Sequence, residues 1–266
     1  MPSTLSPYDP SSRASLVSAL RAAGCVFAED EAELILAAAR TPQEAAAMAD
    51  RRAAGLPLEL VLGWAEFAGL RITVAPGVFV PRRRTEFLVR QALAEVPDAR
   101  VVVDLCCGSG AVGAALAAAL GPVELHAADI DPAAVACARG NTAAADGRVH
   151  EGDLFEALPP GLRGRIDILA ANVPYVPTGE VGLLPAEARD HEPLVALDGG
   201  TDGLDILRRV AAEAPRWLAP GGRLLIETSE RQAPAATEAF TAAGLSTRLA
   251  VDDELYAQVV IGTRTG

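Results

Sequence analysis

The sequence predicts an α/β protein, with a doubly wound sheet preceded by a small helical domain. Two observations predict this fold class. From about residue 100 onward, short apolar runs alternate with helical patterns, as in sheets whose strands are joined by crossover helices. Residues 11–68 are instead rich in Ala, Leu and Glu at helical spacing.

The N-terminal helices are indicated by "DEAELILAAAR" and "TPQEAAAMADRRAAG", of which "TPQE" is typical of a capping box. The next segment, "LRITVAPGVFVPRR", places β-branched residues on both sides of Ala-Pro-Gly and predicts a hairpin. We therefore expect a helical domain over residues 1–70, a hairpin linker over 71–95 and an α/β domain over 96–266.

The α/β domain is expected to alternate strands and helices throughout. Strands are predicted over 100–106, 123–130, 147–153, 166–172, 221–229 and 256–264. Helices are predicted over 110–120, 131–144, 203–218 and 233–244, the second with Pro132 in its first turn. In a doubly wound sheet, ligands bind beyond the carboxyl ends of the strands.

Composition and charge exclude several classes of protein. A net charge of −12 disfavours a general nucleic-acid-binding surface, although "PRRRTE" at 81–86 leaves open a local basic patch or a solvated loop. No apolar stretch reaches the length of a membrane span, and no signal-peptide pattern opens the chain, so we expect a cytoplasmic protein. The four cysteines lack the spacing of a metal site or a disulfide framework, and no metal is expected.

The first strand–helix junction, "VVVDLCCGSGAVGAAL", has the literal spacing GxGxxG at Gly108, Gly110 and Gly113. In a dinucleotide fingerprint the first glycine leaves the strand directly, whereas here Asp104 ends the strand and three residues intervene. A carboxylate at this point would repel a pyrophosphate and suits a ligand with a positive amino group. A nicotinamide oxidoreductase is therefore disfavoured.

Two further acids follow the next strands. Asp129 closes the second strand, where it can accept hydrogen bonds from ribose hydroxyls, and Asp153 in "HEGDLF" can accept one from an adenine amino group. A ligand with an ammonium group, a ribose and an adenine but no phosphate is S-adenosylmethionine. Acids at strand ends often only cap the next helix, and we assign that role to Asp131.

Cys106 and Cys107 lie within the glycine loop. We interpret them as small residues that let the backbone close on a ligand. A catalytic thiol is disfavoured because no histidine accompanies them in the sequence.

The fourth predicted strand ends in Asn172-Val173-Pro174-Tyr175, across the expected crevice from the glycine loop. This is either a turn or a site that holds a planar NH2 group. The Asn172 amide oxygen and the Val173 backbone carbonyl would grip two N–H bonds, and Pro174 restricts the direction of that carbonyl. Tyr175 would supply a face for stacking. The independent signs of a methyl-donor site favour the second interpretation.

On these residues the chain resembles the HemK-type protein-(glutamine N5) methyltransferases along nearly its whole length. "DLCCGSG", "ADIDPAAVACARGN" and "GDLF" resemble the cofactor motifs of that family, and "HEPLVALDGGTDGL" and "LAPGGRLLIE" resemble its downstream segments. The resemblance implies a class I, Rossmann-like methyltransferase fold with an N-terminal substrate-recognition domain. It implies methylation of a protein glutamine, as in the Gly-Gly-Gln motif of peptide-chain release factors, with S-adenosylhomocysteine as product.

The resemblance also assigns residues by position. It implies cofactor contacts at Cys106, Cys107, Gly108, Ser109, Gly110, Asp129, Ile130, Asp153 and Leu154, beside Asp104, and substrate contacts at Asn172, Val173, Pro174 and Tyr175. Two departures stand out. Val173 replaces a proline of the family tetrapeptide Asn-Pro-Pro-Tyr, and Arg82-Arg83-Arg84 falls where the family usually has Arg-Pro-Glu/Asp, so the chain resembles a divergent branch.

Other functions remain open at this stage. The same tetrapeptide would hold the exocyclic amino group of adenine in DNA or RNA, although the negative charge disfavours this. Methylation of a small molecule or another protein side chain, and a non-catalytic paralogue that binds the cofactor, are the remaining alternatives. A protein partner, without a membrane or stable nucleic-acid association, is expected.

Overall fold

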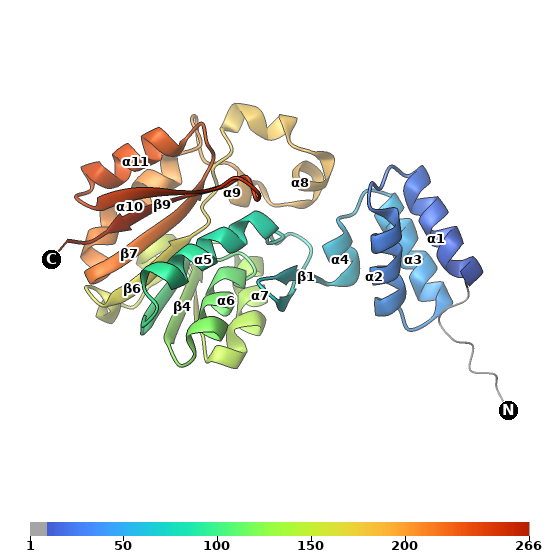
Figure 1. The fold of residues 1–266 in the computed structure, drawn as a ribbon, viewed down its shortest axis with the longest axis horizontal. Coiled ribbons are helices and arrows are strands. Elements are labelled where there is room, and N and C mark those ends of the chain that lie inside the picture. The colour runs from blue at the N-terminus through green and yellow to red at the C-terminus, as the bar shows by residue number, and fades with distance from the viewer. Residues whose placement is uncertain (1–9, 266) are drawn as a thin grey trace.

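The structure, a computed structural model, describes residues 10–265. Figure 1 shows a small bundle of helices near the N-terminus and a larger α/β part, joined by a narrow segment. The bundle consists of α1 (Pro10–Ala22), α2 (Ala28–Ala38), α3 (Pro42–Ala53) and α4 (Leu58–Leu62).

The bundle has its own hydrophobic core, which includes the buried side chains of Leu20, Ile35 and Met48. The capping motif predicted from "TPQE" begins α3. The backbone N–H of Glu44 donates to Thr41 Oγ1 at 3.1 Å, and Pro42 occupies the first turn. The Glu44 carboxylate accepts from the N–H of Arg40, one residue before the cap.

The joining segment contains a hairpin, but its turn is not at the Ala-Pro-Gly that the sequence predicts. Strands β1 (Trp64–Phe67) and β2 (Leu70–Thr73) pair antiparallel, and the turn is Ala68-Gly69, both with positive φ. Two such residues make the tight turn that matches strand twist. The Ala-Pro-Gly sequence lies after β2, and Val78 and Val80 form no strand but are buried. These two valines are buried although they lie outside any strand, so their alternating apolar pattern resembles that of a strand.

The α/β part is built on a seven-stranded sheet in the order β5-β4-β3-β6-β7-β9-β8. Its strands are β3 (Val101–Leu105), β4 (Glu124–Asp129), β5 (Arg148–Glu151), β6 (Ile166–Ala171), β7 (Leu218–Thr228), β8 (Ser246–Asp252) and β9 (Ala257–Thr263). The helices are α5 (Glu86–Glu95), α6 (Ala111–Leu120), α7 (Pro132–Thr142), α8 (Ala186–His191), α9 (Leu194–Leu197), α10 (Asp205–Trp217) and α11 (Ala233–Ala242). Short 3-10 helices are η1 (Arg83–Thr85), η2 (Ala143–Ala145), η3 (Leu154–Ala157), η4 (Pro160–Leu162) and η5 (Thr178–Leu183).

Strands β3 to β7 are parallel, whereas β9 and β8 run antiparallel at one edge. The edge strand β8 is absent from the predicted elements. Its sequence, "STRLAVD", buries only Ala250, so it lacks the apolar alternation by which strands are recognised. Pairing with β9 over its full length, not burial, makes it a strand.

Both faces of the sheet are covered, as a doubly wound sheet requires. Alternate β3 side chains enter different cores: Val103 packs in the cluster with α10 and α11, and Val102 packs in the cluster with α5 and α6. Helix α5 falls inside the predicted linker 71–95 but packs on β7 and β9.

The strand order reverses at β3, because the chain continues outward to β4 and β5 and then returns to β6 on the other side. The crevice beyond the carboxyl ends of β3 and β6 is thus the switch point where such sheets bind ligands. Within residues 10–265, no helix combines the length and apolarity needed to cross a membrane.

Candidate active site

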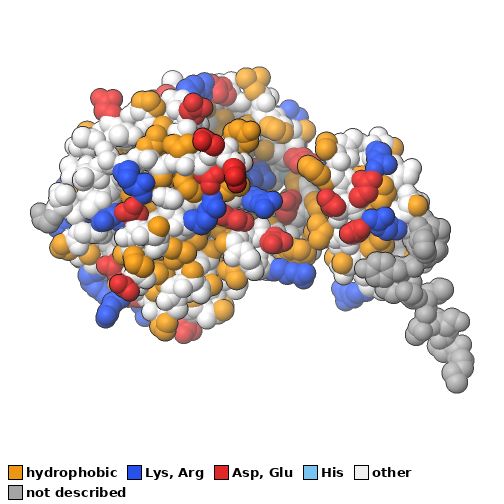
Figure 2. Space-filling view, in the orientation of Figure 1, with side chains coloured by type: hydrophobic (Ala, Val, Ile, Leu, Met, Phe, Trp, Pro, Cys, Tyr) orange, Lys and Arg blue, Asp and Glu red, His pale blue; other side chains and the backbone are white. Residues whose placement is uncertain are grey.

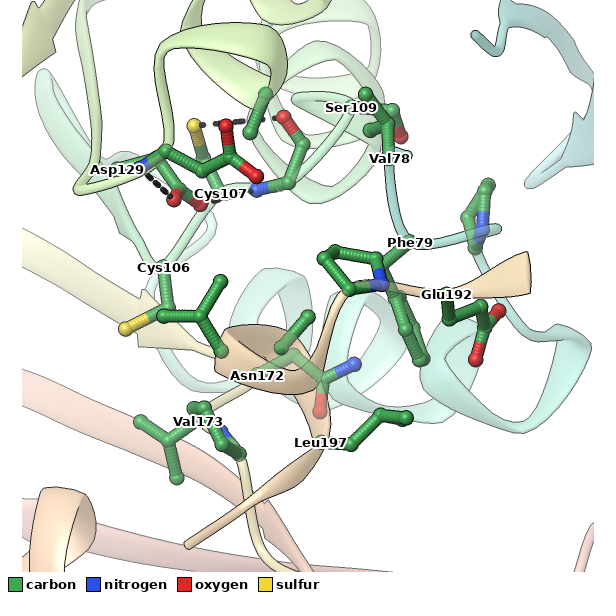
Figure 3. Close-up of a pocket in the computed structure, with 18 of the residues that line it drawn as sticks. Val78, Phe79, Cys106, Cys107, Ser109, Asp129, Asn172, Val173, Glu192 and Leu197 are labelled. Atoms are coloured by element: carbon green, nitrogen blue, oxygen red, sulfur yellow. Dashed lines mark hydrogen bonds between the residues drawn. The ribbon is translucent and has the colours of Figure 1, made fainter. Parts of the chain in front are cut away.

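A cavity of about 590 Å³ opens at this switch point. It is lined by every site residue predicted from the sequence except Gly110, which is the N-cap of α6 (Ala111–Leu120). Figure 3 shows the two halves of the lining, with Cys106, Cys107 and Asp129 on one side and Asn172 and Val173 on the other. The fold therefore brings the two predicted groups of residues to one cavity.

The loop after β3 is tightly curved. Cys106, Gly108 and Gly110 all have positive φ, and the N–H of Gly110 donates to the Cys107 carbonyl at 2.7 Å. A Cβ at Gly110 would approach Ala138 of α7 to 3.0 Å, so this glycine lets the loop pack directly on the next helix.

Asp104 is a buried residue of β3, one position before its end. Its carboxylate accepts a 2.8 Å hydrogen bond from the N–H of Gly113, and a Cβ at Gly113 would approach Asp104 to 3.2 Å. The third glycine of the GxGxxG spacing thus accommodates a carboxylate. Burial, with the Asp129 charge adding to it, raises the pKa of Asp104 to about 8 despite that hydrogen bond.

Asp129 ends β4 and ties the loop to that strand. Its Oδ2 accepts from the N–H of Gly108 at 2.8 Å and its Oδ1 from the N–H of Asp131 at 2.9 Å. Burial raises the pKa of Asp129. Asp131 itself caps α7, as expected, by accepting from the N–H of Ala133.

Asp153 is more exposed and forms an ion pair of 2.6 Å with Arg209 of α10. Arg209 lines the same cavity but was not identified from the sequence, because the two residues lie 56 positions apart. Ile130 is half-exposed at the rim, and Leu154 adopts a positive φ beside Asp153.

The two cysteines lie deep in the loop. Burial, with nearby carboxylates adding to it, raises the pKa of both thiols above the ordinary value. The raised pKa keeps both thiols protonated at neutral pH, which disfavours a nucleophilic role.

Across the cavity, the four residues after β6 form the second half of the site. Asn172 Oδ1 is buried and accepts no hydrogen bond from any described residue. The Val173 side chain, 1% exposed, points into the sheet core, while no hydrogen bond to its carbonyl oxygen is formed within residues 10–265. Two acceptors without donors thus stand side by side in sequence at the end of β6.

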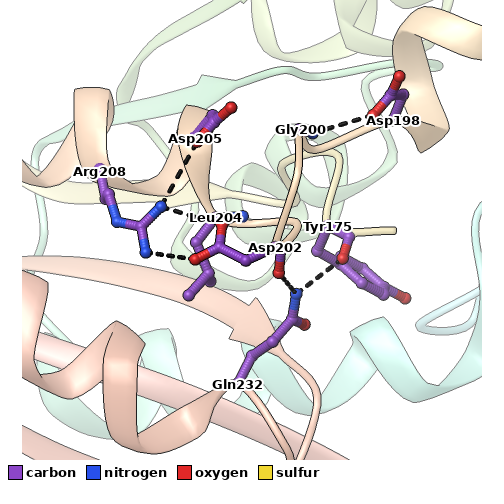
Figure 4. Close-up of polar contacts among 8 residues, drawn as sticks. All are labelled: Tyr175, Asp198, Gly200, Asp202, Leu204, Asp205, Arg208 and Gln232. Atoms are coloured by element: carbon purple, nitrogen blue, oxygen red, sulfur yellow. Dashed lines mark hydrogen bonds and ion pairs between the residues drawn. The ribbon is translucent and has the colours of Figure 1, made fainter. Parts of the chain in front are cut away.

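The backbone of this tetrapeptide is held by Gln232, at the start of α11, and lies against the segment after α9, as Figure 4 shows. The Gln232 side-chain N–H2 donates to the carbonyls of Tyr175 and Asp202, both at 2.9 Å. A Cβ at Gly203 would lie 2.2 Å from the Tyr175 carbonyl oxygen, and one at Gly199 2.5 Å from that of Pro174. Gly199 and Gly203 of "LDGGTDGL" are therefore required by close approach to the tetrapeptide, and Gln232 is a further residue of the site that no local sequence pattern indicates.

The three arginines at 82–84 do not form a basic patch or a solvated loop, because two of them pair with glutamates. Arg82 pairs with Glu192 at 2.5 Å and Arg84 with Glu227 at 3.0 Å, and both glutamates are buried. Arg84 also donates to the Tyr175 hydroxyl. Burial, with Arg82 opposing it, raises the pKa of Glu192.

The cavity extends toward the helical bundle. Glu187 of α8 lines it and pairs at 2.6 Å with Arg52 of α3, which also holds Glu31. Figure 2 shows acidic and basic side chains around the hollow between the two parts of the molecule. The bundle therefore contacts one wall of the cavity through an ion pair.

Comparisons with known proteins find methyltransferases. A family model described as methyltransferase small domain matches residues 69–183. The release factor glutamine methyltransferase of Geobacter sulfurreducens is 38% identical over 230 residues, which cover 85% of this chain and 80% of that protein. The 4-amino-L-phenylalanine/4-methylamino-L-phenylalanine methyltransferase of Streptomyces pristinaespiralis is 36% identical over 201 residues, or 73% of this chain and 68% of that protein.

Among solved structures, a methyltransferase from Pyrococcus furiosus matches with a TM-score of 0.56 at 16% identity. The match covers 74% of this chain and 90% of that chain. At this level of identity the likeness concerns the fold, and it confirms the class I methyltransferase fold predicted from the sequence.

Proposed function

The chain belongs to the release factor glutamine methyltransferase family, and from this premise we propose that it methylates the side-chain amide nitrogen (N5) of a protein glutamine. The proposed substrate is the Gly-Gly-Gln motif of a peptide-chain release factor, and the proposed methyl donor is S-adenosylmethionine. The observation that carries the proposal is a pair of consecutive acceptors, the buried Asn172 Oδ1 and the Val173 carbonyl, that receive no hydrogen bond from residues 10–265. An unpaired buried acceptor is unfavourable by about 1–3 kcal/mol, and Asn172 lines the cavity, where the N–H of a ligand would satisfy it.

The loop side of the cavity fits the proposed cofactor. Three carboxylates at or just after successive strand ends line it, and these hydrogen-bond acceptors suit an ammonium group, hydroxyls and an amino group better than a phosphate. We assign Asp104 to the amino group, Asp129 to the ribose hydroxyls and Asp153 to the adenine amino group. Asp153 keeps Oδ1 free of hydrogen bonds to described residues, while Oδ2 holds Arg209. The bound cofactor supplies an electrophilic methyl group on a positive sulfur.

The tetrapeptide Asn172–Tyr175 would orient the nucleophile. An amide nitrogen attacks poorly because its lone pair is delocalised, so its two N–H bonds must be held with the lone pair turned to the methyl carbon. Asn172 Oδ1 and the Val173 carbonyl are the two acceptors for those N–H bonds. The N–C bond forms as the S–C bond breaks, and the extra proton on nitrogen then leaves to solvent.

No strong base is required in this mechanism. Burial, with the Glu227 charge adding to it, raises the pKa of Tyr175 to about 12, so its phenol stays neutral near pH 7. Positioning by neutral acceptors is thus the proposed source of rate acceleration. We further propose that the N-terminal domain, residues 1–70, recognises the substrate outside the glutamine, since its Arg52 pairs with Glu187 on the cavity wall.

A second candidate is methylation of an aromatic amine. It is favoured by the similarity to the aminophenylalanine methyltransferase, because an aryl NH2 is also planar and carries two N–H bonds. Such a ligand would use the same two acceptors and the Tyr175 ring.

The deciding experiment is transfer of a labelled methyl group to a purified release factor. We expect label on the wild-type factor and none on a factor with its Gly-Gly-Gln glutamine changed to alanine. Label that persists in the altered factor would contradict the assigned glutamine, and transfer to 4-aminophenylalanine alone would establish the second candidate.

A further inference from the structure

The linker arginine Arg84 connects three parts of the molecule. Its Nε donates to Glu227 Oε1 of β7 at 3.0 Å, and one of its terminal nitrogens donates to the Tyr175 hydroxyl. Its guanidinium carbon lies 5.7 Å from the centre of the Tyr175 ring. The linker, the central sheet and the substrate side of the cavity therefore meet at one side chain.

Glu227 holds this arginine in place. The carboxylate is 3% exposed, and Arg84 is its only ion-pair partner among residues 10–265. A buried carboxylate requires a partner of opposite charge, whereas the arginine is 45% exposed on its other side. The ion pair with the buried Glu227 thus fixes the position of the Arg84 guanidinium.

Tyr175 is consequently held at both ends. Gln232 donates to its backbone carbonyl at 2.9 Å, and Arg84 donates to its hydroxyl. Tyr175 lines the same cavity as Asn172. A ring anchored at its hydroxyl has fewer orientations than one anchored only through its backbone.

We propose that Arg84 is a positioning residue that acts through the Tyr175 hydroxyl to fix the ring against which the substrate amide lies. This inference rests on the proposed function of the cavity. Arg84 does not touch the reacting atoms, so its effect is on orientation of the substrate. Because Arg84 lies in η1, between the hairpin and α5, the conformation of this linker would also influence the position of the Tyr175 ring.

The test is a double-mutant cycle between Arg84→Met and Tyr175→Phe, with methylation of release factor as the readout. Each single change should lower kcat about 10-fold and leave cofactor affinity by calorimetry unchanged, because orientation but not cofactor binding is lost. The double variant should be no slower than the slower single variant, since both changes remove the same contact.

Two further variants separate this role from a structural one. Arg83→Met is the matched control: Arg83 forms no ion pair within the described residues and does not line the cavity. Its kcat should equal that of the wild type. If Arg84→Met fails to fold because Glu227 loses its partner, the cycle is repeated in a Glu227→Gln background, where no buried charge is left uncompensated.

An activity-independent arm uses fluorine NMR on protein labelled with fluorotyrosine. The chain has three tyrosines, and the line missing in Tyr175→Phe identifies Tyr175. That line should move in Arg84→Met and stay in place in Arg83→Met. Absence of methylation by the wild type would count against the proposed function alone, since the NMR arm is unaffected. Additive losses of kcat, or an unmoved Tyr175 line, would overturn the role of Arg84.

Discussion

The backbone N–H of Gly108 donates a 2.8 Å hydrogen bond to the Asp129 carboxylate, which joins the glycine loop to the end of β4. Each carboxylate oxygen of Asp129 is used once by the backbone and has capacity for a further hydrogen bond. Asp129 therefore shapes the loop and would at the same time bind the ribose.

We expect Asp129→Ala to weaken cofactor binding by at least about 10-fold, because it removes two charge-assisted acceptors and loosens the loop. Calorimetric titration with S-adenosylmethionine measures this directly. Asp98→Ala, on the exposed turn between α5 and β3, is the control and should bind normally. An unchanged affinity in Asp129→Ala would remove the ribose assignment.

Asn172→Ala should affect turnover and not cofactor binding, the opposite of the effect expected for Asp129→Ala. We expect turnover to fall about 100-fold or more with cofactor affinity nearly intact, since the lost acceptor orients only the substrate amide. Single-turnover methylation with saturating cofactor is the appropriate measurement. Survival of most of the activity would show that the positioning mechanism is wrong.

A substitution at Val173 distinguishes the role of its backbone carbonyl from that of its side chain. Its side chain is buried in the sheet core, so Val173→Ala should cost about 1–3 kcal/mol of unfolding free energy while kcat stays within about twofold. Denaturant unfolding and methylation assays on the same preparation compare the two effects. A large loss of kcat at unchanged stability would assign the side chain, not the carbonyl, to the site.

Gly203→Ala tests the support behind the tetrapeptide. The added Cβ would lie 2.2 Å from the Tyr175 carbonyl oxygen at a φ of +77°, so the segment must move. We expect a lower melting temperature and a loss of kcat together. Gly161→Ala, whose Cβ would meet nothing within 4 Å, is the matched control and should change neither.

The regular pattern of the sequence explains which features were predictable. The alternation of strands and helices from residue 100 and the four-residue motif after β6 are local signals. Both place the predicted residues at the carboxyl edge of the sheet, where the cavity lies. The strand β8 was missed because its pairing, not its apolar pattern, defines it. The hairpin was misplaced because Ala68-Gly69 is a weaker turn signal than Ala-Pro-Gly.

The partners of the site residues were not predictable for a different reason. Gln232 lies 57 positions from Tyr175, and Glu227 lies 143 positions from Arg84. Such contacts depend on strand order and on how loops return over the sheet edge. No local pattern encodes them, and the run Arg82–Arg84 therefore looked like a surface feature although two of its members face buried acids.

Asp104 should release a proton when the cofactor binds. Burial raises the pKa of Asp104 to about 8, so at pH 7 most of the free enzyme carries a proton on this carboxyl. An ammonium group bound beside it would stabilise the charged form and lower that pKa. Binding of S-adenosylmethionine at pH 7 should therefore release about one proton, and affinity should rise as the pH increases from 6 to 7.

Calorimetry in buffers of different ionisation enthalpy measures this release, because each released proton adds the heat of buffer protonation. Asp104→Asn should bind the cofactor more weakly and with a heat that no longer depends on the buffer. Equal heats for the wild type in all buffers would mean that Asp104 does not face the ammonium group, and its hydrogen bond to Gly113 would then be its whole role.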